Sequence, residues 1–322
     1  MANKIKNEKI NKIALISLFV SVGLMVVAFV LGFVANVFLY DRDYATEKSE
    51  VVYASSPEDI SKLGAAIYND RIYLTNDIHI SDKSYKIGTD TFPFTGVFNG
   101  NGHTVYLDYT SVDESTSLFD YLGKGAVVEN VNFVLGNVIV SGNGYGAIAK
   151  INDGTIRNCS VKYKSITISE PGVYSPLASI NRGTIKGVLV EGELVSKVSS
   201  DKERNVFFGN ACAYNSGTLD SAIALASFSG FNSTDELAIL KGEAKNYAIC
   251  AVHFRDVNGG ISHNTATVLK KGTHTADDRA SEIEFLELSQ LLVENKLYID
   301  LDFSNDFWTI SKGKIALKIK EG

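Results

Sequence analysis

Short runs of alternating apolar and polar residues recur along the middle of the chain. Three copies cover residues 145–161, 174–190 and 208–223, and each holds an Asn-x-Gly-Thr turn followed by an alternating run. Looser copies lie at residues 117–131 and 247–264. Alternation with a period of two predicts β-strands, and a repeat of this size predicts a solenoid in which each copy forms one coil.

Equivalent positions in these copies carry similar residues, which predicts stacks of side chains inside the solenoid. Parallel strands lie about 4.8 Å apart, so equivalent side chains of adjacent coils are expected to touch. The expected aliphatic ladder consists of Val128, Ile156, Ile185, Leu219 and Ile261. The expected amide ladder, with hydrogen bonds from coil to coil, consists of Asn152, Asn181 and Asn215. The alternative for these asparagines is that each is an ordinary turn residue.

The same register places a cysteine in a slot for small side chains. Cys212 aligns with Ala149 and Ala178, which predicts a buried and chemically inert thiol. Lys186 follows the inward Ile185 by one position, so its side chain is expected to point outward.

Both ends of the repeat region are predicted to form caps, over about residues 56–90 and 276–322. A Ser-Pro-Glu-Asp sequence opens the first cap and is typical of a helix N-terminus. In the second cap, apolar spacing over residues 281–295 predicts a helix, and residues 307–310 and 314–320 predict a β-hairpin. The fold class is therefore mainly β, a parallel β-helix with capping helices and a C-terminal hairpin.

An uncharged apolar run covers residues 13–40 and predicts one transmembrane helix before this body. Four lysines lie within residues 1–12, so the positive-inside rule places that segment in the cytoplasm. We expect an uncleaved signal anchor in the lipid bilayer of the cell membrane, a polar linker over residues 41–55 and an extracellular domain over residues 56–322.

Composition narrows the function classes. The chain of 322 residues is 45% hydrophobic and carries a formal net charge of −6, and the basic residues near its start leave the rest more acidic still. An acidic body repels polyanions, so no nucleic-acid partner is expected. The 3 cysteines are too few, and odd in number, for a disulfide framework, so we expect all of them to be unpaired.

One segment resembles a known signature. The run Pro93-Phe-Thr-Gly-Val-Phe-Asn-Gly-Asn-Gly-His-Thr-Val105 is similar to the Phe-x-Gly-x-Phe-Asp-Gly-Asn-Gly-His-x-Ile signature of bacterial surface proteins with GLUG motifs, with Asn99 in place of the usual Asp. The copies at 145–161 and 174–190 resemble the GLUG repeats, and the resemblance covers about residues 55–320. It implies a right-handed parallel β-helix, an extracytoplasmic location, and adhesion or carbohydrate contact.

Few residues indicate chemistry. The acids Asp300, Asp302 and Asp306 lie close in sequence and are weak candidates for calcium, because the glycine and closing glutamate of an EF-hand loop are missing. His103 lies among glycines and is expected to serve a turn. The chain has neither a His-Glu-x-x-His nor a Gly-x-Ser-x-Gly motif, so no catalytic residue, cofactor or enzymatic activity is predicted. The long inserts at 191–207 and 228–246 are the best places for a binding surface.

These observations predict a membrane-anchored, cell-surface β-helix that acts as a binding, adhesion or scaffold module. Its expected partners are the bilayer and a surface glycan or protein. One alternative is an accessory subunit of a larger envelope complex with membrane-protein partners. A second alternative is a carbohydrate-active enzyme, which would need paired carboxylates on adjacent coils.

Overall fold

The computed structural model describes residues 50–61, 70–199, 206–230, 265–269 and 283–319, and all of them belong to one compact unit, Ser49–Gly322. The expected cytoplasmic segment and the expected transmembrane helix over residues 13–40 lie outside these residues. In the part of the chain that the structure describes, no helix has the length and apolar character needed to cross a membrane.

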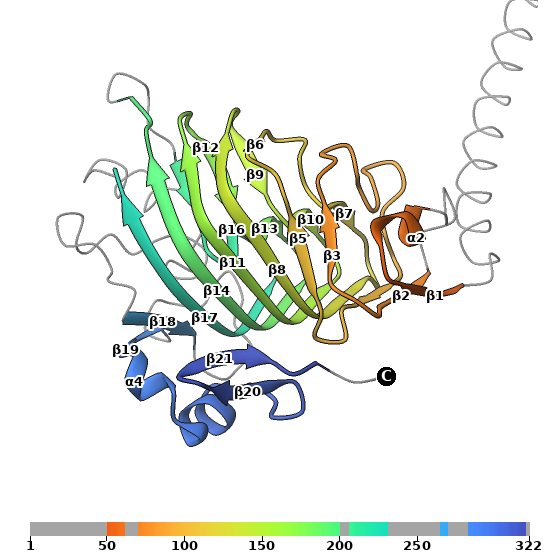
Figure 1. The fold of residues 1–322 in the computed structure, drawn as a ribbon. Coiled ribbons are helices and arrows are strands. Elements are labelled where there is room, and N and C mark those ends of the chain that lie inside the picture. Colours follow the sequence, from red (N-terminus) through yellow and green to blue (C-terminus); the bar gives the residue numbers. More distant parts are fainter. Residues whose placement is uncertain (1–49, 62–69, 200–205, 231–264, 270–282, 320–322) are drawn as a thin grey trace, which may run out of the picture. The chain divides into compact units, whose positions relative to one another are not determined.

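One long sheet of twelve strands runs through the body (Figure 1). It is parallel from its first strand to β17, and β18 and β19 then add in antiparallel orientation. Its main path is β1 (Val51–Ala54), β2 (Arg71–Leu74), β4 (Val97–Asn99), β8 (Val127–Val140), β11 (Thr155–Ile168), β14 (Thr184–Ser196), β17 (Thr218–Ser229), β18 (Thr265–Leu269) and β19 (Ile283–Glu287). Beside this path lie β3 (Ile78–Ile80), β5 (Thr104–Leu107) and β6 (Ser111–Val112).

Two smaller parallel sheets complete the coils. The four-stranded sheet contains β7 (Phe119–Leu122), β10 (Ala149–Asn152), β13 (Ala178–Asn181) and β16 (Cys212–Asn215). The three-stranded sheet contains β9 (Gly144–Gly146), β12 (Gly172–Ser175) and β15 (Val206–Phe208). Each complete coil supplies one strand to each sheet, as in β9, β10 and β11. This arrangement confirms the predicted mainly β fold and its parallel solenoid.

A single residue with a left-handed backbone makes a corner within each long strand. The β-pairing skips this residue: Arg157 pairs with Lys186 and Cys159 pairs with Val188, while Asn158 between them has no partner in the register. Ile156 and Cys159 are consequently both buried, although they are three positions apart. The aligned corner residues are Asn130 (φ 55°), Asn158 (φ 50°), Gly187 (φ 61°) and Ser221 (φ 54°). Gly and Asn are the residues that tolerate this conformation best.

The N-terminal end of the solenoid begins earlier than the sequence predicts. Strand β1 lies inside residues 41–55, the expected linker, and pairs in parallel with β2. Helix α2 (Pro57–Ser61) follows it, and the Asp59 carboxylate accepts hydrogen bonds from the backbone N–H groups of Ser55 and Ser56. Ile60 of this helix is fully buried, so α2 helps to close the core.

The C-terminal region differs in part from the prediction. Residues 283–287, expected to be helical, form β19, because their backbone pairs with β18. After β19 come the short helix α4 (Leu288–Leu291) and a π-helix, η3 (Asn295–Asp300). The hairpin then appears at the expected place as β20 (Trp308–Ser311) and β21 (Lys314–Leu317). We name residues 288–317 the C-terminal strap.

The strap packs against the outer face of the long sheet. A second hydrophobic cluster, separate from the core inside the coils, joins Leu189 of β14 and Ile223 of β17 to apolar side chains of the strap. The buried members from the strap are Leu291, Leu297, Leu301, Phe303, Trp308, Ile315 and Leu317. The Trp308 Nε1–H donates to Oδ1 of Asn158, 3.4 Å away, so the strap also contacts a corner residue of the solenoid.

Candidate functional site

The structure places the aliphatic ladder residues at partner positions. Ile156 pairs with Val128 on one side and with Ile185 on the other, and Ile185 pairs with Leu219. All four side chains are buried. Ile261 lies outside the described residues. A parallel aromatic stack of Tyr145, Tyr174 and Phe208 fills the facing side of the same coils.

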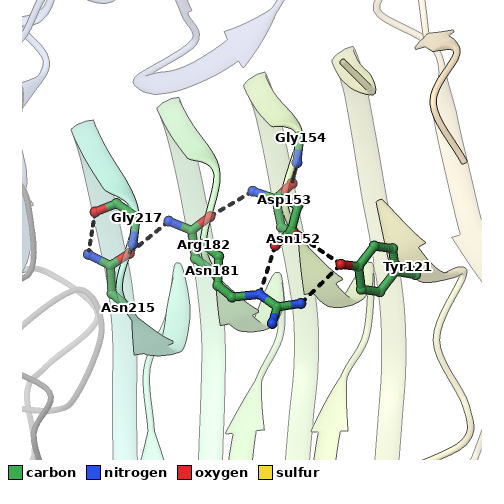
Figure 2. Close-up of polar contacts among 8 residues, drawn as sticks. All are labelled: Tyr121, Asn152, Asp153, Gly154, Asn181, Arg182, Asn215 and Gly217. Atoms are coloured by element: carbon green, nitrogen blue, oxygen red, sulfur yellow. Dashed lines mark hydrogen bonds and ion pairs between the residues drawn. The ribbon is translucent and has the colours of Figure 1, made fainter. Parts of the chain in front are cut away.

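The three asparagines form a continuous chain of amide hydrogen bonds at one turn (Figure 2). The Nδ2 of Asn152 donates to Oδ1 of Asn181 at 2.7 Å, and the Nδ2 of Asn181 donates to Oδ1 of Asn215 at 2.7 Å. Backbone N–H groups of the turns complete the network: Gly154 donates to Asn152 and Gly217 donates to Asn215. Since all three amides are buried and hydrogen-bonded, the ladder stabilises the turn and is not available to a ligand.

A polar cluster lies on the outside of this turn. The Tyr121 hydroxyl donates to Asp153 Oδ2 at 2.5 Å, and Arg182 Nε donates to Asp153 Oδ1 at 2.7 Å (Figure 2). A second nitrogen of Arg182 donates to the Tyr121 hydroxyl at 3.1 Å, and the guanidinium carbon lies 5.8 Å from the centre of the Tyr121 ring. The hydrogen bond to Asp153, followed by burial, raises the pKa of Tyr121, which therefore stays a hydrogen-bond donor at neutral pH.

Apolar side chains extend this cluster across the four-stranded sheet. In the register of β7, β10, β13 and β16, Tyr121 aligns with Ile151, Ile180 and Tyr214. The two isoleucines are partly exposed, and Tyr214 is 37% exposed. We name the surface of Tyr121, Ile151, Asp153, Ile180, Arg182 and Tyr214 the Tyr121 face.

The sequence offered one signal for this face. Asp153 and Arg182 occupy the same place in successive Asn-x-Gly-Thr turns. Their register therefore predicts that a negative and a positive side chain lie next to each other on adjacent coils. Tyr121 could not be found in this way, because its copy is one of the looser ones.

Acidic residues elsewhere on the coils also face basic residues of the adjacent coil. Examples are Glu129 with Arg157 (2.6 Å), Lys150 with Asp120 (3.7 Å), Lys162 with Glu191 (3.2 Å) and Lys186 with Asp220 (3.0 Å). A glycosidase needs two carboxylates that face the same gap. The carboxylates of these pairs instead face cations, an arrangement that fixes the coils to each other.

Among the side chains that the structure describes, the calcium candidates do not come together as a metal site. The Asp302 carboxylate lies 3.3 Å from Lys186 Nζ, and Asp306 is exposed. The Asp300 side chain lies outside the described part. Among the residues that the structure describes, no group of three or more His, Cys, Asp or Glu side chains could hold a metal ion. His103 lies at a turn, where its N–H donates to the Gly100 carbonyl and its Nδ1 is 3.4 Å from Asp77.

Two of the three cysteines, Cys159 and Cys212, are described; both are buried and neither forms a disulfide. Cys212 aligns with Ala178, which in turn aligns with Ala149, so it occupies the small-residue slot. Burial raises the pKa of the Cys159 thiol to about 12, which keeps it protonated and unreactive. Cys250 lies outside the described residues, as do residues 200–205 and 231–246 of the two long inserts.

Comparison with known proteins gave one family. The model of the vacuolating cytotoxin (VacA) β-helical domain matches residues 48–170, less than half of the chain. No curated protein and no solved structure matches the chain. The similarity to GLUG repeats therefore stays a prediction. Residues 48–170 are similar to a β-helical domain of a known protein family, and with the observed coils this match supports a right-handed parallel β-helix.

Proposed function

We propose that the protein is a membrane-anchored, cell-surface β-helix that binds a protein ligand through the Tyr121 face. The anchor is the apolar run over residues 13–40, with basic residues before it. The similarity to the β-helical domain of a vacuolating cytotoxin supports a surface or secreted setting. The observation that carries the binding role is the Tyr121 face itself.

The composition of this face suits a protein partner. Tyrosine and arginine are enriched in the energetically important parts of interfaces, and apolar side chains between them lose water on binding. Here Ile151 and Ile180 separate two tyrosines, and Arg182 is already oriented by Asp153. Because the two tyrosines and the two isoleucines lie on paired strands, their backbone loses little conformational freedom when a ligand binds.

The interaction is tested with a photo-crosslinking amino acid at position 214, introduced into the full chain in intact cells. We expect a defined protein to be captured there, and the Ile180→Asp variant to abolish capture. Lys164, exposed on β11 of the long sheet, is the control position. Equal capture of the same protein from positions 164 and 214 would contradict the proposal.

The identity of the captured protein separates this proposal from the accessory-subunit alternative. A host or neighbouring-cell surface protein supports adhesion, whereas membrane proteins of the same envelope support a role as a subunit of an envelope complex. The orientation is tested in the same cells, since added protease should remove an epitope after residue 50 and spare one at residue 2. Protection of both epitopes would contradict the surface location.

A further inference from the structure

The long sheet begins with an edge strand that lacks the usual protection. β1 is the first strand in the sheet order, and no described strand pairs with its outer edge (Figure 1). Two of its four side chains are large and exposed, Val51 (52% accessible) and Tyr53 (69%), whereas Val52 and Ala54 face the core. The Tyr53 ring packs beside Tyr73 of β2, 5.9 Å away between centroids, so its orientation is held.

Two other edges among the described strands are protected. The opposite end of the long sheet is closed by β18 and β19, and β19 carries Glu284 and Glu287. The last strand, β21, begins with the exposed Lys314. Charges, prolines and covering segments are the usual means by which edge strands avoid pairing with other chains. The sequence of β1, Val-Val-Tyr-Ala, has no charge and no proline.

The hydrogen bonds of β1 show which backbone groups face the open edge. Arg71 N–H donates to the Glu50 carbonyl, and Thr75 N–H donates to the Ala54 carbonyl. Successive residues of a strand direct their backbone groups to alternate edges. Residues 50, 52 and 54 therefore bond to β2, and the N–H and C=O groups of Val51 and Tyr53 point to the outer edge.

We infer that β1 pairs with β1 of a second copy of this chain, in antiparallel orientation about a twofold axis at Val52. In this register Val51 of one copy faces Tyr53 of the other, and the two residues exchange both backbone hydrogen bonds. The twofold axis generates the same pair of hydrogen bonds between Tyr53 of the first copy and Val51 of the second. The N–H and C=O groups of Val51 and Tyr53 are therefore all hydrogen-bonded in both copies. Each cross-strand pair places the β-branched Val51 opposite the aromatic Tyr53 of the other copy, which is a favourable combination in an antiparallel pair of strands.

The size of the edge determines when pairing occurs. A stable interface buries about 800 Å² on each partner, and a four-residue strand offers much less. The pairing therefore needs the copies to be brought together. Since β1 directly follows the N-terminal segment, anchoring in one membrane would supply that local concentration. This step rests on the anchor of the proposed function.

The test is a disulfide across the axis, in the full chain in its membrane and with Cys250→Ser as background. In the inferred register the two Val52 Cα atoms lie about 4.5 Å apart, within the range of a disulfide. Val52→Cys should therefore give a covalent dimer under mild oxidation. Arg71→Cys, on the next strand and more exposed than the partly buried Val52, is the control and should not cross-link.

A second variant tests the backbone bonds. Tyr53→Pro removes an N–H that faces only the outer edge, so it should abolish the Val52→Cys cross-link while the melting temperature falls little. Equal cross-linking of the Val52→Cys and Arg71→Cys proteins would overturn the inferred register, as would a cross-link that survives Tyr53→Pro.

A third protein separates the two proposals. Replacing residues 1–48 by a parallel two-stranded coiled coil and a flexible linker joins two copies of the compact unit Ser49–Gly322 without a membrane. If Val52→Cys cross-links in this fusion but not in the full chain in its membrane, the β1 pairing is supported and the proposed membrane anchor is contradicted. No cross-link in either protein overturns the β1 pairing.

Discussion

Lys186 Nζ lies 3.3 Å from the Asp302 carboxylate, although the two residues are 116 positions apart in the chain. The same ammonium lies 3.0 Å from Asp220 of the next coil. Hydrogen bonds first to Asp220 and then to Asp302 raise the pKa of Lys186. Lys186 points outward as the alternation predicts, but it connects the coil of β14 to the coil of β17 and both to the strap.

Asp302→Asn should loosen the strap slightly, because it removes the charge that faces Lys186 and keeps a residue type that suits the left-handed backbone of position 302 (φ 57°). Both partners are partly exposed, so we expect a loss of only about 0.2–1 kcal/mol in the free energy of unfolding, and the loss should shrink at high salt. Trp308→Ala removes a fully buried ring from the strap and should cost about 3–5 kcal/mol. Urea unfolding curves measure both effects. Asp306→Ala, which changes an exposed side chain, is the control. If Asp306→Ala lowered the free energy of unfolding as much as Trp308→Ala does, the packing described for the strap would be contradicted.

Ile185→Ala tests the aliphatic ladder. The side chain is fully buried between Ile156 and Leu219, so its truncation leaves a cavity and should destabilise the protein by about 2–5 kcal/mol. Lys164→Ala, on the exposed face of β11, should stay within about 0.5 kcal/mol of the parent protein. Thermal melting of the two variants compares them, and equal melting temperatures would mean that the coil register is misassigned.

Asn181→Leu removes the central amide of the asparagine ladder. The Nδ2 of Asn152 then loses its 2.7 Å acceptor and Oδ1 of Asn215 loses its donor, which we expect to cost about 2–3 kcal/mol. Arg182→Ala changes the next residue along the chain and removes the contacts that the half-exposed guanidinium makes with Asp153 and Tyr121, so its effect should stay below about 1 kcal/mol. If both substitutions shift the urea midpoint equally, the ladder does not stabilise the turn.

The buried thiols should resist alkylation. The reactive species is the thiolate, and burial raises the pKa of Cys159 to about 12. In a Cys250→Ser protein, a maleimide should label Cys159 and Cys212 only after denaturation. Mass spectrometry of the native protein after reaction checks this, and rapid labelling without denaturant would contradict the burial of both side chains.

Stability should fall at alkaline pH. Burial raises the pKa of Tyr109 to about 12, and it also raises the pKa of the fully buried Tyr163. Above the unfolded value of about 10, the folded state holds more protons than the unfolded state, so the free energy of unfolding decreases as pH rises. Below that value these groups contribute no pH dependence. Urea unfolding at about pH 9 and about pH 11 measures the difference, and equal midpoints would show that these phenols are hydrated in the folded state.

Some features could be predicted from the sequence because they repeat within it. Asn152, Asn181 and Asn215 recur beside the same Gly-Thr dipeptide, so their register could be read directly. The corner residues could not be found, because Asn158, Gly187 and Ser221 share a backbone angle but not a residue type. Apolar spacing over residues 283–287 suits a helix, but pairing with β18 decides the structure there.

The strap and the Tyr121 face depend on contacts between residues that are far apart in the sequence, and the alternation of apolar and polar residues within one segment does not predict such contacts. Leu189 and Ile223 occupy outward positions of their strands, where a polar residue is expected. The apolar residues that cover them lie in a segment that does not belong to the repeat.

The strap has a consequence for the order in which the protein is made. Synthesis runs from the N-terminus, so the coils that carry Leu189 and Ile223 emerge long before Trp308. Each new coil can stack on the previous one as it appears, but Leu189 and Ile223 stay exposed to solvent until residues 288–317 have been made. A chain that stops before residue 288 would therefore keep Leu189 and Ile223 exposed on the outer face of the solenoid, where they could associate with apolar surfaces of other proteins.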